Sequence, residues 1–400
     1  MSGPLAGVRV LDMSTVILGP YISQLMGDWG AEVIKVEPPT GDTTRDIGIN
    51  RTPGMAALFL NLNRNKRSIV LDLAQPAAQE ALKKIVKDID IVVHNFRPRP
   101  AAKLGVSYED LSAINPRLIS CTTVGYGSRG RYKDRPAYDD LIQGLGGLAG
   151  LIGRYLHDDP KYVPSAVADK TGSLMALSAI LAALYQREKT GEGQALEVPM
   201  FETLVSFLMA EHLTGPAFEP PLGEAGYVRQ LSPNRRPFRT KDGFVCALPY
   251  TDRNWRDFFT IAGRPDVADD PLFKDVAART ENTAALYGLL GELMETRTTA
   301  EWLADFERLD IPFAPVSSLD DLLADPHLAD IEFFKEYDHP TEGRLRMADS
   351  PAVFSKATSE LQRAAPRLGE HSAEVLREAG YADEDIRKLM EDGVTKGPRA

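Results

Sequence analysis

The 400-residue chain is poor in the residues that would indicate a disulfide framework or a metal site. It has two cysteines, Cys121 and Cys246, which lie far apart in apolar, strand-like runs. We expect both to be buried free thiols. The six histidines are not spaced as metal ligands, so no metal site is predicted.

The chain also lacks a basic excess and a long apolar run. Its net charge of -11 argues against general affinity for nucleic acid, which needs a positive field. The longest apolar candidate, residues 174–184, is interrupted by small and polar residues and falls short of the ~20 residues of a membrane span. Residues 1–10 have no apolar core of a signal peptide. We therefore expect a cytoplasmic protein without a membrane segment.

Strand and helix patterns alternate through the first half of the chain. Apolar strand patterns occupy residues 8–13, 32–36, 68–73, 90–94, 118–124 and 196–198. Helical spacing occupies residues 19–29, 76–89, 169–187 and 201–213. This alternation predicts an α/β fold with a parallel sheet covered by helices on both faces. Short apolar strands agree with burial on both faces.

A composition change divides the chain. Residues 215–237 hold five prolines and little periodicity, which is typical of a linker. We therefore predict a large domain over residues 1–214, a linker over 215–237, a smaller α+β domain over 238–330 and a C-terminal segment over 331–400.

Three motifs look functional but lack the context that they need. Residues 125–130 match G-x-G-x-x-G, but the chain continues into residues 131–136, which do not start a helix, so dinucleotide binding is not predicted. The glycines of residues 144–150 lack the Lys-Ser/Thr of a phosphate-binding loop. Asp139 and Asp140 are adjacent and should point in different directions, so they are not expected to share a proton.

Asp169 is the candidate nucleophile. It directly precedes a strong helical stripe, where an N-cap carboxylate would face free backbone N–H groups and stay ionised. An oriented, ionised carboxylate beside a pocket suits covalent acyl transfer, and Gly172 leaves room for a bulky group. The alternative is that Asp169 is only a helix cap.

Basic residues follow the strand that ends at Asn95 and Phe96. In a parallel sheet ligands bind beyond the carboxyl ends of the strands. Arg97 and Lys103 are therefore candidates for phosphate binding, and Phe96 for contact with a base or a pantetheine arm. A solvated basic turn is the alternative. The same two interpretations apply to the basic residues that follow the next strand, which are Arg129, Arg131, Lys133 and Arg135.

Segments in sequence order carry a resemblance to a known family. They are residues 4–12, 31–38 with Gly41, Asp42 and Arg45, 63–68 leading into 71–73, 95–98 with 104–105, 136–139 with Gln143, Gly146 and Gly147, 168–169 with Gly172, and 190–194 with 199–200. Together they resemble the class III CoA transferases, the CaiB/BaiF family, which includes the formyl-CoA transferases.

The resemblance implies a Rossmann-like large domain, a smaller α+β domain and a C-terminal segment that returns to the large domain. It also implies a homodimer of interlocked subunits. The implied substrates are an acyl-CoA and a carboxylic acid, with no permanently bound cofactor. In the implied chemistry, Asp169 attacks the thioester and then carries CoA as an aspartyl thioester. The CoA contacts implied or predicted are Val16, Leu71, Asn95, Phe96, Arg97, Lys103, Arg135, Tyr138 and Met200.

The chain departs from the family pattern at some positions. Pro38 stands where some transferases have an arginine, and the glycine-run loop of the formyl-CoA branch is not apparent. Two other functions compete with transfer. A 2-methylacyl-CoA racemase needs an acid/base pair. The racemases that resemble this chain have a histidine at the position of Tyr138. A non-catalytic acyl-CoA-binding protein is the other. The substrate acids are not readable; the arginines of residues 235–239 bind either a second carboxylate or solvent.

Overall fold

The computed structural model describes residues 3–398, which divide into two compact units. The first unit contains the described parts of Met1–Gly147, Tyr162–Phe207 and Ala329–Ala400, and the second contains Leu148–Lys161 and Leu208–Leu328. The division differs from the predicted domains, because residues 148–161 belong with the second unit. Helix α7 (Leu148–Leu156) is bonded there: Arg154 Nη1 donates to Ala225 O at 2.7 Å, and Tyr155 Oη donates to Arg235 O at 2.8 Å.

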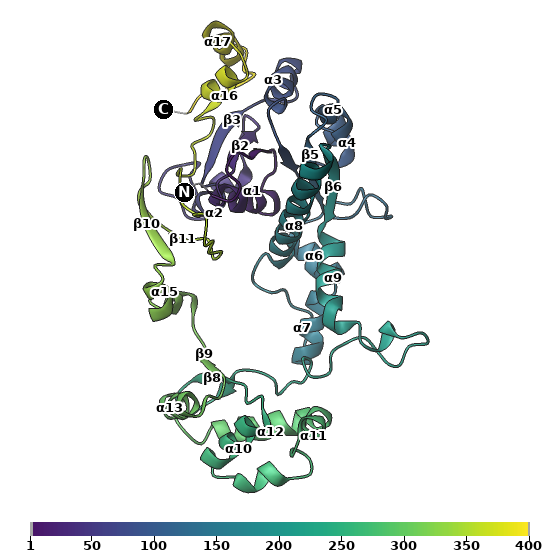
Figure 1. The fold of residues 1–400 in the computed structure, drawn as a ribbon, viewed down its shortest axis with the longest axis vertical. Helices are drawn as coiled ribbons and strands as arrows, with labels where there is room; N and C mark the ends of the chain where they lie inside the picture. Colours follow the sequence, from purple (N-terminus) through teal and green to yellow (C-terminus); the bar gives the residue numbers. More distant parts are fainter. Residues whose placement is uncertain (1–2, 399–400) are drawn as a thin grey trace. The chain divides into compact units, whose positions relative to one another are not determined.

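A six-stranded sheet forms the centre of the first unit (Figure 1), and all its neighbouring strands are parallel. This confirms the predicted parallel α/β sheet. The order β3-β2-β1-β4-β5-β6 reverses direction between β1 and β4, as in doubly wound nucleotide-binding folds. The strands are β1 (Arg9–Asp12), β2 (Glu32–Glu37), β3 (Lys66–Val70), β4 (Ile91–His94), β5 (Ile119–Val124) and β6 (Gln194–Pro199).

Both faces of this sheet are covered, because successive side chains of a strand point to opposite faces. In β1, Val10 belongs to one buried cluster and Leu11 to another. Ile22 and Ile180 join the cluster of Val10, which lies under α1 (Leu18–Asp28) and α8 (Val167–Thr190). The cluster of Leu11 includes Leu82 of α3 (Pro76–Val86). The remaining elements that begin in the first unit before β10 are η1 (Thr43–Asp46), α2 (Ala57–Leu62), α4 (Pro98–Lys103), α5 (Tyr108–Ser112), α6 (Asp139–Leu145) and α9 (Met200–His212).

Helix α8 is long and apolar enough to cross a membrane by length and composition alone. It packs instead against α1, β5 and β6. Its fully buried positions include small residues such as Gly172, Ala176 and Ala183, which allow close approach to these neighbours. One side of the helix is therefore buried in the first unit, while Leu174, Met175 and Tyr185 are exposed.

The third strand begins earlier than predicted. We expected it over residues 68–73, but β3 is Lys66–Val70, and every one of its side chains is buried. Lys66 and Arg67 look like loop residues in the sequence because charged groups are rarely buried without partners. Here they have partners: Lys66 pairs with Asp12, and Arg67 bonds to Glu374 at 2.7 Å and Glu378 at 2.6 Å.

The C-terminal part of the chain packs on the first unit. Helix α16 (Ser372–Glu378) lies against β3 and α3. His371 N donates to Ser68 O at 2.9 Å, which attaches the start of this helix to β3. The other elements of this part are the hairpin strands β10 (Phe334–His339) and β11 (Gly343–Ala348), and α17 (Asp383–Glu391).

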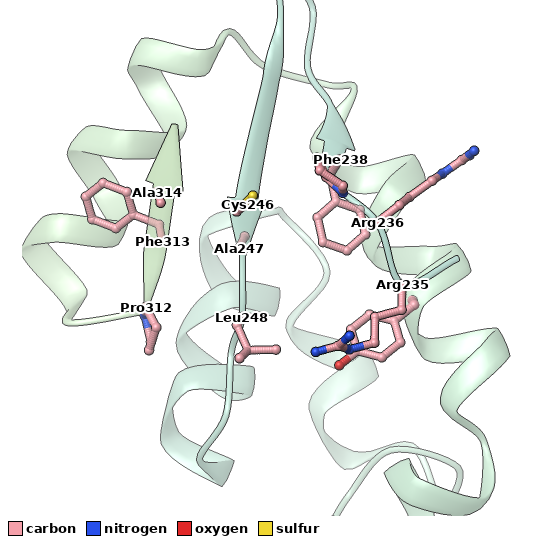
Figure 2. A pocket seen from close by; sticks show the side chains of 11 residues that line it. Arg235, Arg236, Phe238, Cys246, Ala247, Leu248, Pro312, Phe313 and Ala314 are labelled. Carbon is pink, nitrogen blue, oxygen red and sulfur yellow. The ribbon is translucent and has the colours of Figure 1, made fainter. Parts of the chain in front are cut away.

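The second unit holds a small antiparallel sheet of β7 (Phe238–Arg239), β8 (Phe244–Ala247) and β9 (Phe313–Pro315), which borders a pocket (Figure 2). Its core is aromatic, with Trp302, Phe258 and Phe306 fully buried. Within the described residues, the predicted linker 215–237 contains only η2 (Gly215–Ala217) as regular structure. The remaining elements are α10 (Asp252–Ile261), η3 (Pro265–Asp269), α11 (Val276–Glu281), α12 (Thr283–Met294), α13 (Thr299–Leu309), α14 (Leu319–Leu322) and α15 (Pro326–Asp330).

Candidate active site at the carboxyl ends of the sheet

A pocket of about 470 Å³ lies at the carboxyl ends of the parallel strands. The loop after β1 contributes Val16, the loop after β4 contributes Asn95 and Phe96, and the residue after β6 is Met200. The strand order reverses between β1 and β4, and this is where doubly wound sheets bind their ligands. We call this cavity the reactive pocket.

Eight of the ten predicted site residues line the reactive pocket: Val16, Asn95, Phe96, Arg97, Arg135, Tyr138, Asp169 and Met200. Leu71 and Lys103 are not among its lining residues. Leu71 is only 1% exposed because its side chain packs into the core beside α3, so its side chain does not reach a ligand here. Lys103 is exposed at the end of α4. Their roles as CoA contacts stay predictions, with Leu71 restricted to its backbone.

Asp169 is not the N-cap of its helix, so this part of the prediction is wrong. Helix α8 begins at Val167 with Ala166 as its cap, which places Asp169 third in the first turn. Among residues 3–398, no donor forms a hydrogen bond to the Asp169 carboxyl group. The carboxyl group therefore faces the pocket without the backbone N–H partners that an N-cap would have.

Asp139 is the partner that sequence reasoning missed. It is the first residue of α6, and its Oδ1 accepts a hydrogen bond from Asp169 N at 3.0 Å. Its Oδ2 accepts one from Gln143 Nε2 at 2.6 Å. Gln143 Oε1 in turn accepts from Val163 N at 2.9 Å, just before α8. The start of α8 is thus held by α6 through two side chains.

The same neighbour changes the acidity of Asp169. Burial of the carboxyl group and the nearby charge of Asp139 raise the pKa of Asp169 to about 7, while Lys170 acts in the opposite direction. The expectation of a fully ionised carboxylate is therefore wrong for the free protein. Near neutral pH, roughly half of the molecules hold a proton on this group.

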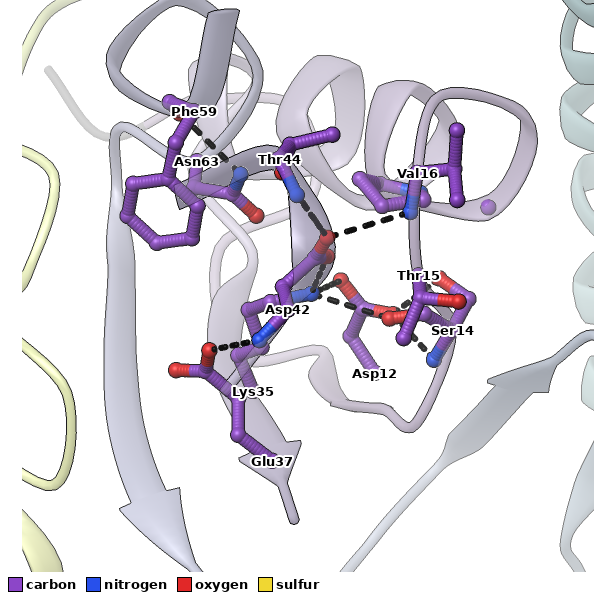
Figure 3. Close-up of polar contacts among 12 residues, drawn as sticks. Asp12, Ser14, Thr15, Val16, Lys35, Glu37, Asp42, Thr44, Phe59 and Asn63 are labelled. Atoms are coloured by element: carbon purple, nitrogen blue, oxygen red, sulfur yellow. Dashed lines mark hydrogen bonds and ion pairs between the residues drawn. The ribbon is translucent and has the colours of Figure 1, made fainter. Parts of the chain in front are cut away.

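The loop between β1 and α1 carries backbone strain at the pocket wall. Val16 has a φ of 73°, which is unusual for a β-branched residue. Asp42 Oδ1 accepts a hydrogen bond from Val16 N at 3.3 Å (Figure 3). Asn95 Nδ2 donates to Thr15 O at 3.1 Å. Such strain persists only where the surroundings hold the residue in place.

Buried charges support this loop from below. Lys35 Nζ lies 2.9 Å from Asp42 Oδ2 and donates to Ser14 O at 2.9 Å, and Lys66 Nζ lies 2.9 Å from Asp12 Oδ2 (Figure 3 shows the pairs around Lys35). All four charged side chains are 0% exposed and balance one another in charge. Burial opposes ionisation of Lys35, but Asp12 and Asp42 outweigh it and raise the Lys35 pKa. We call these four residues the buried charge cluster.

Gly172 lets the wall of the pocket close around Asp169. A Cβ atom at this position would lie 2.7 Å from Leu18 Cδ1 and 3.7 Å from Met200 Cγ. The next residue of α8, Ser173, donates a hydrogen bond from its Oγ to Leu18 O at 2.7 Å. The absence of a side chain at Gly172 therefore brings α8 onto the first turn of α1.

Two exposed arginines lie at the pocket. Arg97 Nη1 donates to Asp134 O at 3.1 Å, and the Arg135 guanidinium stacks 4.0 Å from the centre of the Tyr132 ring. Neither forms an ion pair with a carboxylate of residues 3–398, so both positive charges are available to an anionic ligand.

The glycine motif of residues 125–130 is not a phosphate cradle. The next helix, α6, begins only at Asp139. The backbone N–H groups of Gly127 and Ser128 are taken by Glu202 Oε1 at 3.0 Å and Glu197 Oε1 at 2.8 Å. Carboxylates in these places would repel a phosphate, so the geometry does not favour phosphate binding by this motif. Among residues 3–398, no group of acidic, histidine or cysteine side chains is suited to hold a metal ion.

Comparisons with known proteins identify the family of the chain. The family model of CoA-transferase family III matches residues 5–372. The chain is 31% identical to human succinyl-CoA:glutarate CoA-transferase, over 98% of this chain and 90% of that protein. It is 32% identical to the succinyl-CoA–L-malate CoA-transferase beta subunit of Chloroflexus aurantiacus, over 96% of each. A CaiB/BaiF family crystal structure from Brucella suis superposes with a TM-score of 0.80 at 31% identity, over 95% of this chain and all of that one.

Proposed function

The chain belongs to CoA-transferase family III, and from this premise we propose that it transfers CoA from an acyl-CoA to a carboxylic acid through an aspartyl-CoA thioester on Asp169. The observation that carries the proposal is the Asp169 carboxyl group, which lines the reactive pocket and has no hydrogen-bond donor among residues 3–398. A carboxylate oxygen without a donor is free to form a bond to carbon.

The reaction is a series of balanced acyl transfers. An Asp169 oxygen attacks the thioester carbonyl, the C–S bond breaks, and a mixed anhydride and CoA thiolate form. The thiolate attacks the aspartyl carbonyl and releases the donor acid, which leaves Asp169 as a CoA thioester. The acceptor carboxylate then attacks this thioester, and the returning thiolate takes the acceptor acyl group and frees Asp169. The series thus divides one difficult exchange into several easier acyl transfers.

The raised pKa of Asp169 has a consequence for this sequence. Only the ionised form attacks, so near neutral pH only the molecules with an ionised Asp169 can react. A less stabilised carboxylate is also the better nucleophile once it is ionised, because no hydrogen bond must be broken before it attacks. The crowding of Leu18 and Met200 around Gly172 helps to exclude the water that would hydrolyse an anhydride.

The names of the relatives guide the choice of substrates. Two of them are named for succinyl-CoA as the donor, with glutarate or L-malate as the acceptor. Succinyl-CoA is therefore the first donor to test here. The interlocked homodimer and the cytoplasmic location stay predictions.

The test is direct capture of the intermediate. The protein is incubated with succinyl-CoA and treated with hydroxylamine or borohydride, and the modified peptide is identified by mass spectrometry. We expect a modification at Asp169 that Asp169→Asn lacks while it still binds CoA. If CoA binds to the wild-type protein and no adduct forms on any carboxylate, the protein is a non-catalytic acyl-CoA-binding protein.

The racemase alternative is less compatible with the pocket. Of the described residues, no histidine lines the reactive pocket, and Tyr138 is 70% exposed at its edge. An acid/base pair across an α-carbon is therefore missing one member. Deuterium incorporation at the α-carbon of a 2-methylacyl-CoA, measured without an acceptor acid, would reverse this ranking.

A further inference from the structure

The first unit contains a second cavity, of about 460 Å³, beside strands β4, β5 and β6. Three of its lining residues form a row across these strands, because His94 pairs with Thr122 and Thr122 pairs with Glu197. Phe96 and Leu196 contribute carbon walls. The volume is within the range of small-molecule sites. We call this cavity the His94 groove.

The His94 groove borders the reactive pocket but is a cavity of its own. Phe96 and Val124 line both, whereas Asp169 lines the reactive pocket and is not among the lining residues of the groove. The chemistry at Asp169 therefore does not account for the polar row on the floor of the groove.

The hydrogen bonds of His94 determine what this floor offers to a ligand. The side chain is buried, and burial lowers the pKa of the imidazole to about 4, so the ring is uncharged near neutral pH. Its Nε2 lies 3.1 Å from Thr122 Oγ1, while its Nδ1 is buried and has no partner among residues 3–398. A neutral imidazole has one N–H group, and a buried N–H group is rarely left without an acceptor. The proton therefore belongs on Nε2, which donates to Thr122 Oγ1.

This tautomer leaves the hydroxyl proton of Thr122 unused. Thr122 Oγ1 has no hydrogen-bond partner besides His94 within the described part of the chain. The residue is half-buried and lines the groove, so its hydroxyl group can donate to a bound molecule. The ligand that fits must bring an acceptor, such as a carbonyl oxygen.

The walls of the groove favour a planar, apolar body. Phe96 stacks on His94, with ring centres 5.6 Å apart and 26° between the ring planes. The stacking fixes the orientation of Phe96, whose ring can receive another aromatic ring. Leu196 and Tyr126 add further carbon surface, so the groove suits an aromatic molecule better than a sugar or a chain of polar groups.

The charges along the groove disfavour an anion. Glu109 and Glu197 are exposed lining residues that form no ion pair within residues 3–398. Lys133 is the one basic side chain among the described lining residues, so carboxylates outnumber cations. The substrates of the proposed reaction are anions, and a negative field would lower their local concentration here. The ligand of this groove is therefore of another class.

We propose that the His94 groove binds an uncharged, planar aromatic molecule that carries a carbonyl oxygen, with this oxygen on the Thr122 hydroxyl group and the ring against Phe96 and Leu196. Such a molecule has no carboxylate and is neither a donor nor an acceptor of CoA. The inference goes beyond the proposed function and does not depend on it.

The experiment measures binding of 2-naphthamide by calorimetry, with excess CoA present to occupy the reactive pocket. We expect saturable binding to the wild-type protein, and binding about three- to ten-fold weaker to Thr122→Val, which loses one neutral hydrogen bond. Ala195→Trp should weaken binding at least about ten-fold, because Ala195 is an exposed lining residue of β6 and the indole would fill the groove. Gln194→Trp is the matched control on the opposite face of the same strand and should stay within about two-fold.

The naphthalene ring also provides a matched pair of ligands. The anion 2-naphthoate has the same ring and should bind at least about five-fold more weakly than the amide to the groove. The inference is wrong if 2-naphthamide does not bind the wild-type protein, if Thr122→Val binds it equally well, or if 2-naphthoate binds as tightly. The imidazole nitrogen chemical shifts of His94 supply an independent readout. A proton on Nδ1 instead of Nε2 would overturn the assignment of Thr122 as the donor.

Discussion

Replacement of Asp169 by asparagine should stabilise the fold at neutral pH while it abolishes CoA transfer. The carboxyl group is buried and lies near Asp139, and both conditions raise its pKa to about 7. In an unfolded chain the same group has a pKa close to its ordinary value of 3.8. The folded protein therefore holds the proton more tightly than the unfolded chain, and ionisation of Asp169 favours unfolding.

The sign and the size follow from linkage. Below about pH 4 the group is protonated in both states and contributes nothing to the pH dependence. As the pH rises, the unfolded chain loses this proton first, while the folded protein must either hold it or bear a buried charge. The free energy of unfolding therefore falls with pH, and the fall is complete above about pH 7. A pKa shift of this size corresponds to a loss of unfolding free energy of at most about 4 kcal/mol. Because the group has partial access to solvent, we expect a loss of about 2–4 kcal/mol.

The assay is chemical denaturation of wild-type protein and Asp169→Asn at matched pH values between about 4 and 8. The difference in unfolding free energy should be small at the acidic end and grow in favour of the variant toward the alkaline end. Asp140→Asn is the matched control, because Asp140 is an exposed carboxyl group beside Asp139. The control should show no such growth.

The reasoning would be refuted by a difference that does not depend on pH. It would also be refuted if Asp169→Asn were less stable than the wild-type protein at the alkaline end, since that would mean that the carboxylate makes favourable contacts when ionised. Either result would show that burial and the charge of Asp139 do not raise the pKa of Asp169.

Three further predictions concern the neighbours of Asp169. Asp139→Asn should lower the pKa of Asp169, so the acidic limb of the pH–rate profile for transfer should move to lower pH; an unmoved limb would contradict this. Val16→Gly should keep the thermal midpoint or raise it, because glycine accepts the positive φ, while kcat falls as the pocket wall loses its fixed shape. Lys35→Met should cost about 3–5 kcal/mol in denaturant unfolding, because it leaves Asp42 buried and unpaired; a loss under about 1 kcal/mol would show that the charge cluster is not structural.

The periodic parts of the fold were predictable from the sequence. Strands and helices with clear apolar spacing, such as β1 and α1, lie within a few residues of their expected bounds. The strand β3 was misplaced because Lys66 and Arg67 are buried charges, and periodicity assumes that charges are outside. The pairs that make their burial tolerable join residues far apart in sequence, and one sequence does not reveal them.

The second unit shows the same limit for chain organisation. Residues 148–161 lie inside the predicted large domain, and nothing local assigns them elsewhere. Their assignment depends on the bonds of Arg154 and Tyr155 to Ala225 and Arg235, some 70 to 80 residues away. Such bonds satisfy loop carbonyl groups, which any donor at the right place can do, so they leave no sequence signature.

The Asp169 carboxyl group lines the reactive pocket, but it does not do so as the helix N-cap that the sequence predicted. An N-cap would have made Asp169 a well-stabilised and therefore sluggish carboxylate. The structure instead gives the hydrogen bond of the Asp169 backbone to Asp139, and leaves the Asp169 carboxyl group without a donor of its own. Asp139 thus holds the backbone of α8 in place while its charge makes ionised Asp169 less stable. This arrangement needs two carboxyl groups from the starts of two different helices, Asp139 of α6 and Asp169 of α8. Adjacent acids in the sequence cannot provide this arrangement, but two helix starts converging on one pocket can.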